Sequence, residues 1–583
     1  MGIIPGSQVI YIRRERHFLN LTNNPFNPDV IQTGYFKSRK NFNMKLKYFL
    51  LFLSSVIILG SCRKDFEEID NNPQGFTTAS DGSLFNGIIQ SLLPTWNEQF
   101  YINNEILYAQ TQQAALTKSA WGNFTLGTED MWSNYYKTLP AIRELEKRIA
   151  TYPETPATIN MKAMLLIVRA YKTFKLTDIF GDIPYSAAGY GYQDLGKLYP
   201  VYDDQREIYL SLLDDLAWAA ENINDTAAIA EPFTTFANFD KLFNGRRDMW
   251  RKFANSLRLR HAMRMAEKEP QLASAIIGDI IENNLPVIYG YDFITPVLES
   301  ACIWPGANGF SNESVSWSFR EHNGLRMGSN IWHQFSNTDD PAGSGIFDPR
   351  AYIFFEGDQN EQWIPFPQIP DQGTPSAQGI PYGSHRDDMG NYHIKNNVNY
   401  SPFNFFIIAD ENNMPVILMT GAEVHFIKAE AYFRGIGVAE DKTAADIEYM
   451  NGINASVEWW MNLADRLRLP ISGVKFTDKI TIPQNLNAAS VLMKFGSWNA
   501  VSDEEKLRFI YTQRWIDAFR QPWEAYAEAR RTGLTPREGD PIAHFRMPYP
   551  PSESQYNQAN LNTARLKQGG DEPSVKVWWV PER

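Results

Sequence analysis

The chain has 583 residues, a formal net charge of −12 and aromatic side chains at 14% of its positions. This acidic balance, with no stretch dense in lysine and arginine, argues against nucleic-acid binding as a main function. Only two cysteines occur, Cys62 and Cys302, so the fold does not depend on a framework of intrachain disulfides.

The first predicted element is an export signal over residues 44–61. Two lysines lead into an apolar run over residues 48–59, and small residues precede Cys62. The run is too short to span a membrane, which takes about 20 residues. The four residues that end at Cys62 are similar to the bacterial lipobox, so we expect Cys62 to carry lipid and to begin the mature protein. The alternative is an ordinary secretory signal with an incidental cysteine.

The ends of the chain divide it into parts. A lipoprotein signal begins close to its initiator methionine, so we expect Met44 to be the true start and residues 1–43 to be a gene-model extension. Abundant peptides from before Met44 in the unprocessed precursor would contradict this. A polar tether is expected over residues 62–80, followed by one helical domain over residues 81–583.

Helical periodicity dominates residues 84–265. Residues 161–180 repeat apolar side chains at helical spacing, and the glycine and proline that follow end this helix. Further amphipathic helices are predicted at residues 208–223 and 249–267. Such helices in pairs suit a tetratricopeptide-like array, although no strict repeat of fixed period occurs.

Arg169 falls within the apolar stripe of the helix at residues 161–180. An unpaired buried charge is costly, so we expect Arg169 to meet a carboxylate or a helix-terminal carbonyl. Asp182, just past the end of the helix, is one candidate partner. Alternatively, Asp182 binds backbone N–H groups of the turn.

The character of the sequence changes between about residues 284 and 415. Proline, glycine, asparagine and aromatic residues crowd together there and helical periodicity is lost. The segment is too long for one passive loop, so it predicts an irregular functional subdomain. Helices are expected again at residues 420–434, 444–465 and 503–531, and the tail from residue 532 is Pro-rich and mostly non-helical.

Motifs along these helices match a known family. In chain order they are Trp132-Ser-Asn-Tyr-Tyr136, Arg169-Ala-Tyr171, Phe180-Gly-Asp-Ile-Pro-Tyr185, Asp240-Lys-Leu-Phe-Asn-Gly245, Trp250-Arg-Lys-Phe-Ala-Asn-Ser-Leu-Arg-Leu-Arg260, Glu423-Val-His-Phe-Ile-Lys-Ala-Glu-Ala-Tyr432, Gln513-Arg-Trp515, Glu524-Ala-Tyr526, Arg530-Arg-Thr-Gly533 and Arg546-Met-Pro-Tyr-Pro550 with Asn557. With these motifs behind a lipobox, the chain resembles the SusD/RagB family of nutrient-binding outer-membrane lipoproteins of Bacteroidetes. The resemblance implies a mainly α fold, in which tetratricopeptide-like helix pairs form a scaffold beside an irregular, loop-rich ligand-binding subdomain.

The resemblance also implies a function and a partner. Family members capture oligosaccharides, or in some branches peptides, and deliver them to a TonB-dependent transporter of the SusC/RagA type. The expected location is the outer membrane, lipid-anchored and exposed at the cell surface. The acidic segment at residues 65–68 resembles the signal that sends such lipoproteins there. The sequence does not separate a glycan ligand from a peptide ligand.

Motifs for catalysis are scarce, and no cofactor is predicted. The histidines show no HExxH spacing, and no nucleophile elbow, Walker loop or dinucleotide fingerprint occurs. A glycan-degrading enzyme stays an alternative because carboxylates are plentiful. Structural calcium is a second open point, since Asp339-Asp340 and Asp387-Asp388 are oxygen-rich pairs in predicted loops. A lipoprotein that only stabilises its transporter is a third alternative, which the aromatic-rich region disfavours.

Candidate ligand-binding residues come from two segments that combine aromatic rings with polar groups, as sugar binding requires. They are Trp121 and Asn123 in the first segment, and Trp304, Asn308, Phe310, Trp317, Arg320 and Asn323 in the second. We expect the aromatic residues to stack on a sugar and the polar residues to donate hydrogen bonds. The alternative is that these aromatics pack the irregular subdomain or face the transporter.

Overall fold

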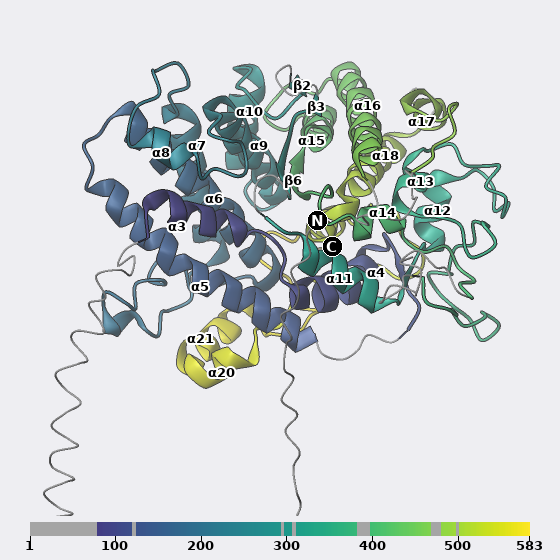
Figure 1. The fold of residues 1–583 in the computed structure, drawn as a ribbon, viewed down its shortest axis with the longest axis horizontal. Coiled ribbons are helices and arrows are strands. Elements are labelled where there is room, and N and C mark those ends of the chain that lie inside the picture. The colour runs from purple at the N-terminus through teal and green to yellow at the C-terminus, as the bar shows by residue number, and fades with distance from the viewer. Residues whose placement is uncertain are drawn as a thin grey trace, which may run out of the picture. The chain divides into compact units, whose positions relative to one another are not determined.

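The computed structural model describes residues 79–118, 124–292, 297–305, 310–381, 397–467, 480–496 and 501–582. The predicted signal, Cys62 and the tether as far as residue 78 lie outside these ranges. The described chain is mostly helical with a few short strands (Figure 1). The predicted mainly α fold is therefore confirmed.

The N-terminal part is a series of helices. They are α3 (Asp81–Gln90), the π-helix η1 (Glu98–Leu107), α4 (Tyr108–Thr111), α5 (Phe124–Ala150), α6 (Pro156–Phe180), the 3-10 helix η2 (Leu195–Lys197), α7 (Gln205–Asn222), α8 (Phe233–Ala237), α9 (Arg247–Met265) and α10 (Pro270–Glu282). Helix α5 packs against α6, α6 against α7, α7 against α9 and α9 against α10. This arrangement is the helical-pair scaffold that the sequence predicts.

The later part alternates short and long helices. They are α11 (Glu313–His322), α12 (Ser329–Phe335), α13 (Arg350–Phe354), α14 (Phe405–Ala409), α15 (Gly421–Arg434), α16 (Lys442–Arg466), α17 (Ala488–Phe495), α18 (Asp503–Asp517), the 3-10 helix η4 (Ala518–Arg520), α19 (Pro522–Thr532), α20 (Pro551–Tyr556) and α21 (Gln558–Gln568). The segment at 284–415 thus contains α11 to α14, which are too short to give a clear periodic signal. The tail likewise contains α20 and α21.

Two helix boundaries differ from the prediction for local reasons. Helix α6 starts earlier than expected because Thr155 and Thr158 form a capping box and Pro156 suits the first turn. The helix predicted at residues 503–531 is two helices. Pro522 has no N–H to continue the hydrogen-bond ladder, so the chain turns through η4 before α19 begins.

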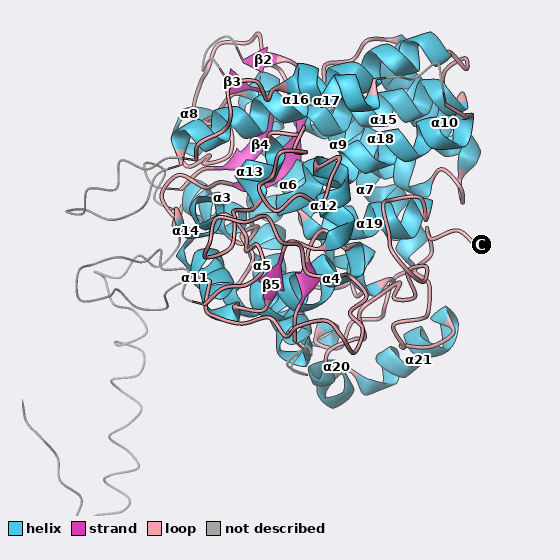
Figure 2. Ribbon diagram, turned by 90° about the vertical axis from the view of Figure 1, so that its right-hand side faces the viewer, coloured by secondary structure: helices cyan, strands magenta, loops and turns pink. Residues whose placement is uncertain are grey.

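The described residues form three antiparallel strand pairs, two of which connect segments that are distant in sequence (Figure 2). Strand β4 (Ser300–Ile303) pairs with β6 (Val416–Thr420), which runs directly into α15. Strand β1 (Ala115–Leu116) pairs with β5 (Leu325–Arg326), and β2 (Tyr291–Asp292) pairs with β3 (Val297–Leu298). The first two pairs attach the irregular subdomain to the helical scaffold.

Arg169 forms ion pairs with Glu146 of α5 and Asp215 of α7, on the two sides of α6. The predicted need for a carboxylate partner is therefore confirmed. Asp182 instead accepts a hydrogen bond from the backbone N–H of Gln205, at the start of α7, at 2.8 Å. Asp182 therefore binds a backbone N–H group, but that of α7 and not, as expected, one of its own turn.

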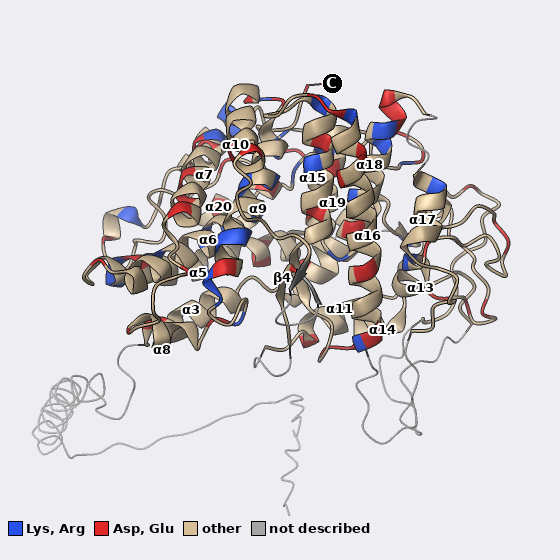
Figure 3. Ribbon diagram, turned by 90° about the horizontal axis from the view of Figure 1, so that it is seen from above, with Lys and Arg blue, Asp and Glu red and all other residues tan. Residues whose placement is uncertain are grey.

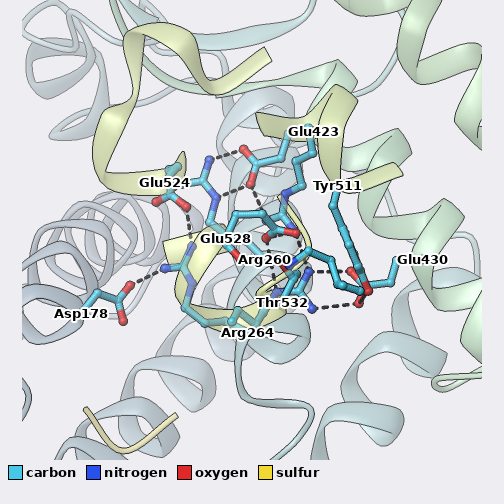
Figure 4. Close-up of polar contacts among 12 residues, drawn as sticks. Asp178, Arg260, Arg264, Glu423, Glu430, Tyr511, Glu524, Glu528 and Thr532 are labelled. Carbon is cyan, nitrogen blue, oxygen red and sulfur yellow. Dashed lines mark hydrogen bonds and ion pairs between the residues drawn. The ribbon is translucent and has the colours of Figure 1, made fainter. Parts of the chain in front are cut away.

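A buried cluster of ion pairs holds α6, α9, α15, α18 and α19 together (Figure 4). Arg260 Nε lies 2.8 Å from Glu423 Oε1, and Arg264 forms ion pairs with both Asp178 and Glu524. On the other side of the cluster, Arg531 reaches Glu430 and Glu528, each at 2.7 Å, and Arg514 lies 3.0 Å from Glu528. We refer to these groups as the buried ion-pair cluster.

Candidate functional site

The structure brings the ends of the two predicted ligand segments together. In the β1–β5 pair, Ala115 lies opposite Arg326 and Leu116 opposite Leu325. The backbone N–H of Thr117 continues this pairing by donating to the carbonyl of Gly324 at 2.9 Å. The chain that leads toward residues 119–123 therefore lies beside the end of α11. Trp121, Asn123 and Asn308 themselves are outside the described residues.

Trp304 directly follows β4 and is partly buried. The guanidinium of Arg466, the last residue of α16, lies 5.2 Å from the centroid of its ring. A guanidinium at this distance is attracted to the negative face of the indole. Strand pairing fixes the backbone that precedes Trp304. Arg466, at the end of α16, lies against the Trp304 ring and restricts its position.

Trp317 and Arg320 lie one turn apart on α11. The guanidinium carbon of Arg320 is 4.1 Å from the centroid of the Trp317 ring. Arg320 is only 4% exposed, whereas Trp317 keeps part of its surface exposed. The buried arginine thus supports a partly exposed ring, which is a suitable geometry for a flat stacking surface.

Asn323 and Phe310 have more local roles. Asn323 ends α11 in the left-handed conformation, with φ of 54°, and its Nδ2 donates to the carbonyl of Glu321 at 3.1 Å. Phe310 is 5% exposed and belongs to the hydrophobic core beneath the N-terminal helices. For Phe310, the structure therefore matches the packing alternative that the sequence left open.

The π-helix η1 lies under α11 and was not predicted from the sequence. It contributes Phe100 and Tyr101, and Trp96 just before it stacks on Phe100 with ring centroids 4.6 Å apart. Trp96 and Tyr101 are partly exposed. Extended π-helical turns are rare and often occur at functional sites. Its wider period hides such a turn from a search for α-helical spacing, although three aromatic residues within six positions are a compositional signal.

Titratable groups are buried where η1 meets α11. His322 Nε2 lies 3.5 Å from Glu105 Oε1, and both side chains are about 1% exposed. Burial lowers the pKa of His322, although the nearby Glu105 opposes the shift. Burial and the positive charge of Arg326 likewise lower the pKa of Lys118, again opposed by Glu105.

The predicted calcium ligands are only partly described. Asp339 Oδ1 accepts a hydrogen bond from Trp332 Nε1 at 3.0 Å, and Asp340 Oδ1 accepts one from the backbone of Ala342 at 3.1 Å. Asp387 and Asp388 lie outside the described residues. Within the described ranges, no three or more His, Cys, Asp or Glu side chains are grouped so that they could hold a metal ion. Calcium binding stays a prediction.

Membrane attachment was also predicted from the sequence. Among the helices of the described ranges, none combines the length and the apolar character needed to cross a membrane.

Comparisons with known proteins point to one family. A family model of SusD-like proteins, described as "Starch-binding associating with outer membrane", matches residues 71–550. A solved chitin-binding protein shares 22% identity and a TM-score of 0.62, over 86% of this chain and 100% of its own. A SusD homologue from Parabacteroides distasonis shares 20% identity and a TM-score of 0.63, over 86% of this chain and 98% of its own.

A further solved SusD homologue, from Bacteroides thetaiotaomicron, shares 20% identity and a TM-score of 0.59, over 87% of this chain and 100% of its own. At these identities the structural matches show a common fold. No curated protein matches the chain.

Proposed function

The chain belongs to the SusD-like family, and on that premise we propose that it is a cell-surface lipoprotein that captures oligosaccharides and delivers them to a TonB-dependent transporter of the SusC type. The family is described as starch-binding and associated with the outer membrane, and one structural relative is a chitin-binding protein. Both descriptions concern binding and favour a carbohydrate ligand. The same architecture with a peptide ligand is the alternative.

The observation that carries this proposal is the pair of tryptophans held by arginines. Trp304 and Trp317 are partly exposed, and Arg466 and Arg320 restrict their rings. Sugar rings present apolar C–H faces that stack on such rigid, flat surfaces, while guanidinium N–H groups suit the hydroxyls around them. We assign Trp304 and Trp317 as stacking residues. Trp121, Asn123 and Asn308 stay candidates from the neighbouring segments.

Calorimetric titration with soluble chitin and starch oligosaccharides tests the ligand class. We expect binding that weakens in Trp304→Ala and in Trp317→Ala while the unfolding temperature stays close to wild type. Tyr556→Ala is a matched control, because Tyr556 is 69% exposed and lies on α20. Unchanged affinity in both tryptophan variants would remove this site, and binding of a peptide mixture in place of oligosaccharides would support the alternative.

Incubation with the same oligosaccharides distinguishes binding from catalysis. We propose that the protein releases its ligand unchanged. Chromatography of the oligosaccharide after prolonged incubation should therefore show no shorter product. Appearance of cleaved product would instead support the enzyme alternative.

Delivery requires an anchor and a partner. We propose that Cys62 is lipidated and that the anchored protein associates with a SusC-like barrel in the outer membrane. In native cells, Cys62→Ser should move the protein from the membrane fraction to the soluble fraction. Cross-linking in intact outer membranes should join the wild-type chain to a TonB-dependent barrel. Recovery of the chain alone would contradict the partner assignment.

A further inference from the structure

Helices α5, α6 and α7 enclose a groove that none of the predicted site residues line. Its volume is about 720 Å³, within the range of about 300–1,000 Å³ that is common for ligand sites. Figure 1 places α6 and α7 on the left of the view, whereas α11 and α14 lie to the right of its centre. The groove is therefore separate from the candidate oligosaccharide site.

One face of α6 forms the floor of the groove, and α5 and α7 form its sides. On α6, residues 158, 162, 165, 166 and 169 recur every three or four positions, so they line one face of the helix. This face extends about 16 Å along the axis at about 1.5 Å per residue. Leu165 and Leu166 form an aliphatic floor, Ile149 adds to it from α5, and Trp218 stands on the α7 side.

Charges are distributed unequally along the groove. At one end Arg169 forms ion pairs with Glu146 and Asp215, and Arg143 also pairs with Glu146. Glu154 and Asp214 also line the groove, are exposed, and form no ion pair within the described part of the chain. Acidic residues outnumber basic residues on α7, as Figure 3 shows. The groove therefore keeps two carboxylates available to a positively charged group.

The face of the Trp218 ring is in contact with a cation of this chain. The ammonium of Lys162, which is exposed on α6, lies 3.9 Å from the centroid of the Trp218 ring. This is a close cation–π contact. Burial also raises the pKa of Asp215, although Arg169 lies beside it and opposes the shift.

We propose that this groove binds a basic peptide segment of a partner protein, in which lysine or arginine side chains alternate with aliphatic ones. Cationic side chains would meet the carboxylates of Glu154 and Asp214, and aliphatic side chains would pack on Leu165 and Leu166. About five residues of extended chain span the length of the groove. A sugar is a poorer occupant, because the floor is aliphatic and the aromatic ring already faces an ammonium group.

The probe for this proposal is a seven-residue, end-capped peptide that alternates lysine and leucine, with a glutamate-for-lysine version as its counterpart. Calorimetric titration of the full chain should show binding of the basic peptide alone. Binding should weaken as salt rises, because the contacts are exposed charges. Glu154→Gln combined with Asp214→Asn should reduce the affinity about fivefold to tenfold. Glu282→Gln combined with Asp540→Asn removes two exposed charges that do not line the groove and should leave the affinity unchanged.

A second variant acts in the opposite direction. Lys162→Ala removes the chain's own cation from the Trp218 ring and should tighten binding of the basic peptide. Oligosaccharide affinity should be unchanged in all these variants, so this proposal and the proposed function can fail separately. Equal binding of both peptides, or equal affinity of the groove and control variants, would overturn the assignment. Loss of oligosaccharide binding in Glu154→Gln/Asp214→Asn would make the groove a glycan site instead.

Discussion

The buried ion-pair cluster and the aromatic face around α11 use arginine in two different ways. In the cluster, Arg260 and Arg264 are almost completely buried and each bridges carboxylates from different helices. At the aromatic face, Arg320 and Arg466 lie against tryptophan rings that stay partly exposed. The first arrangement fixes helices relative to one another, and the second orients side chains that a ligand can reach.

The energetic consequences differ accordingly. Removing one member of a buried ion pair leaves an uncompensated charge in a medium of low polarity, which is strongly destabilising. Removing the exposed Arg466 from the face of Trp304 costs only a modest cation–π attraction. Substitutions in the two regions should therefore separate stability from ligand affinity.

The largest expected effect is in the buried cluster. Arg264→Met leaves Asp178 and Glu524 without their shared cation and should lower the free energy of unfolding by about 3–5 kcal/mol. Arg508→Met is the matched control, since Arg508 pairs with Glu504 on the exposed side of α18 and should change stability by about 0.5 kcal/mol or less. Denaturant unfolding measures both. Equal stability of the two variants would show that the buried cluster contributes little.

Lys172 is a third kind of buried cation and gives a pH dependence. Its ammonium donates to the carbonyl of Ser91 at 2.7 Å and forms no ion pair within the described ranges. Burial, together with the charge of Lys175, lowers the pKa of Lys172 to about 7. Because the unfolded chain keeps this lysine protonated to about pH 10, unfolding takes up a proton above pH 7 and stability rises with pH.

Comparison of wild type with Lys172→Met isolates this effect. Between pH 7 and 9, the free energy of unfolding of wild type should rise relative to the variant by on the order of 2 kcal/mol. Unfolding at several pH values measures the difference. A difference that does not change with pH would mean that Lys172 is charged in the folded protein.

Trp317→Ala tests the other side of the comparison. The ring is partly exposed, so its removal should affect stability less than Arg264→Met does. Loss of one stacking surface should weaken oligosaccharide binding about tenfold, which corresponds to about 1.4 kcal/mol. Titration and unfolding of the same preparation give both numbers. A large loss of stability would instead assign Trp317 to the core.

Much of the scaffold could be predicted because its signals are local. Apolar spacing placed α6, and the cost of an unpaired charge required a carboxylate near Arg169. The identity of its partners, Glu146 and Asp215, could not be predicted, since they lie on neighbouring helices whose packing the local sequence does not specify. Pro522 was a visible signal, and its interruption of the helix was nevertheless missed.

The candidate site was predictable only in outline. Composition singled out Trp304 and Trp317, whose rings are partly exposed, and equally Phe310, which the tertiary packing buries. The guanidinium beside Trp304 comes from Arg466, far along the chain, and no local pattern connects the two. The aromatic residues of η1 were missed because a π-helical turn does not follow the α-helical period.

The smallest expected effect distinguishes positioning from contact. Arg466→Lys keeps the positive charge near Trp304 but loses the planar group that can lie against the ring. If Arg466 mainly orients Trp304, oligosaccharide affinity should fall about twofold to fivefold in Arg466→Lys, and this variant should add nothing in a Trp304→Ala background. Titration of the two single variants and the double variant measures this coupling. Additive losses would show that Arg466 contacts the ligand itself, so that the aromatic face would use its arginines for binding as well as for support.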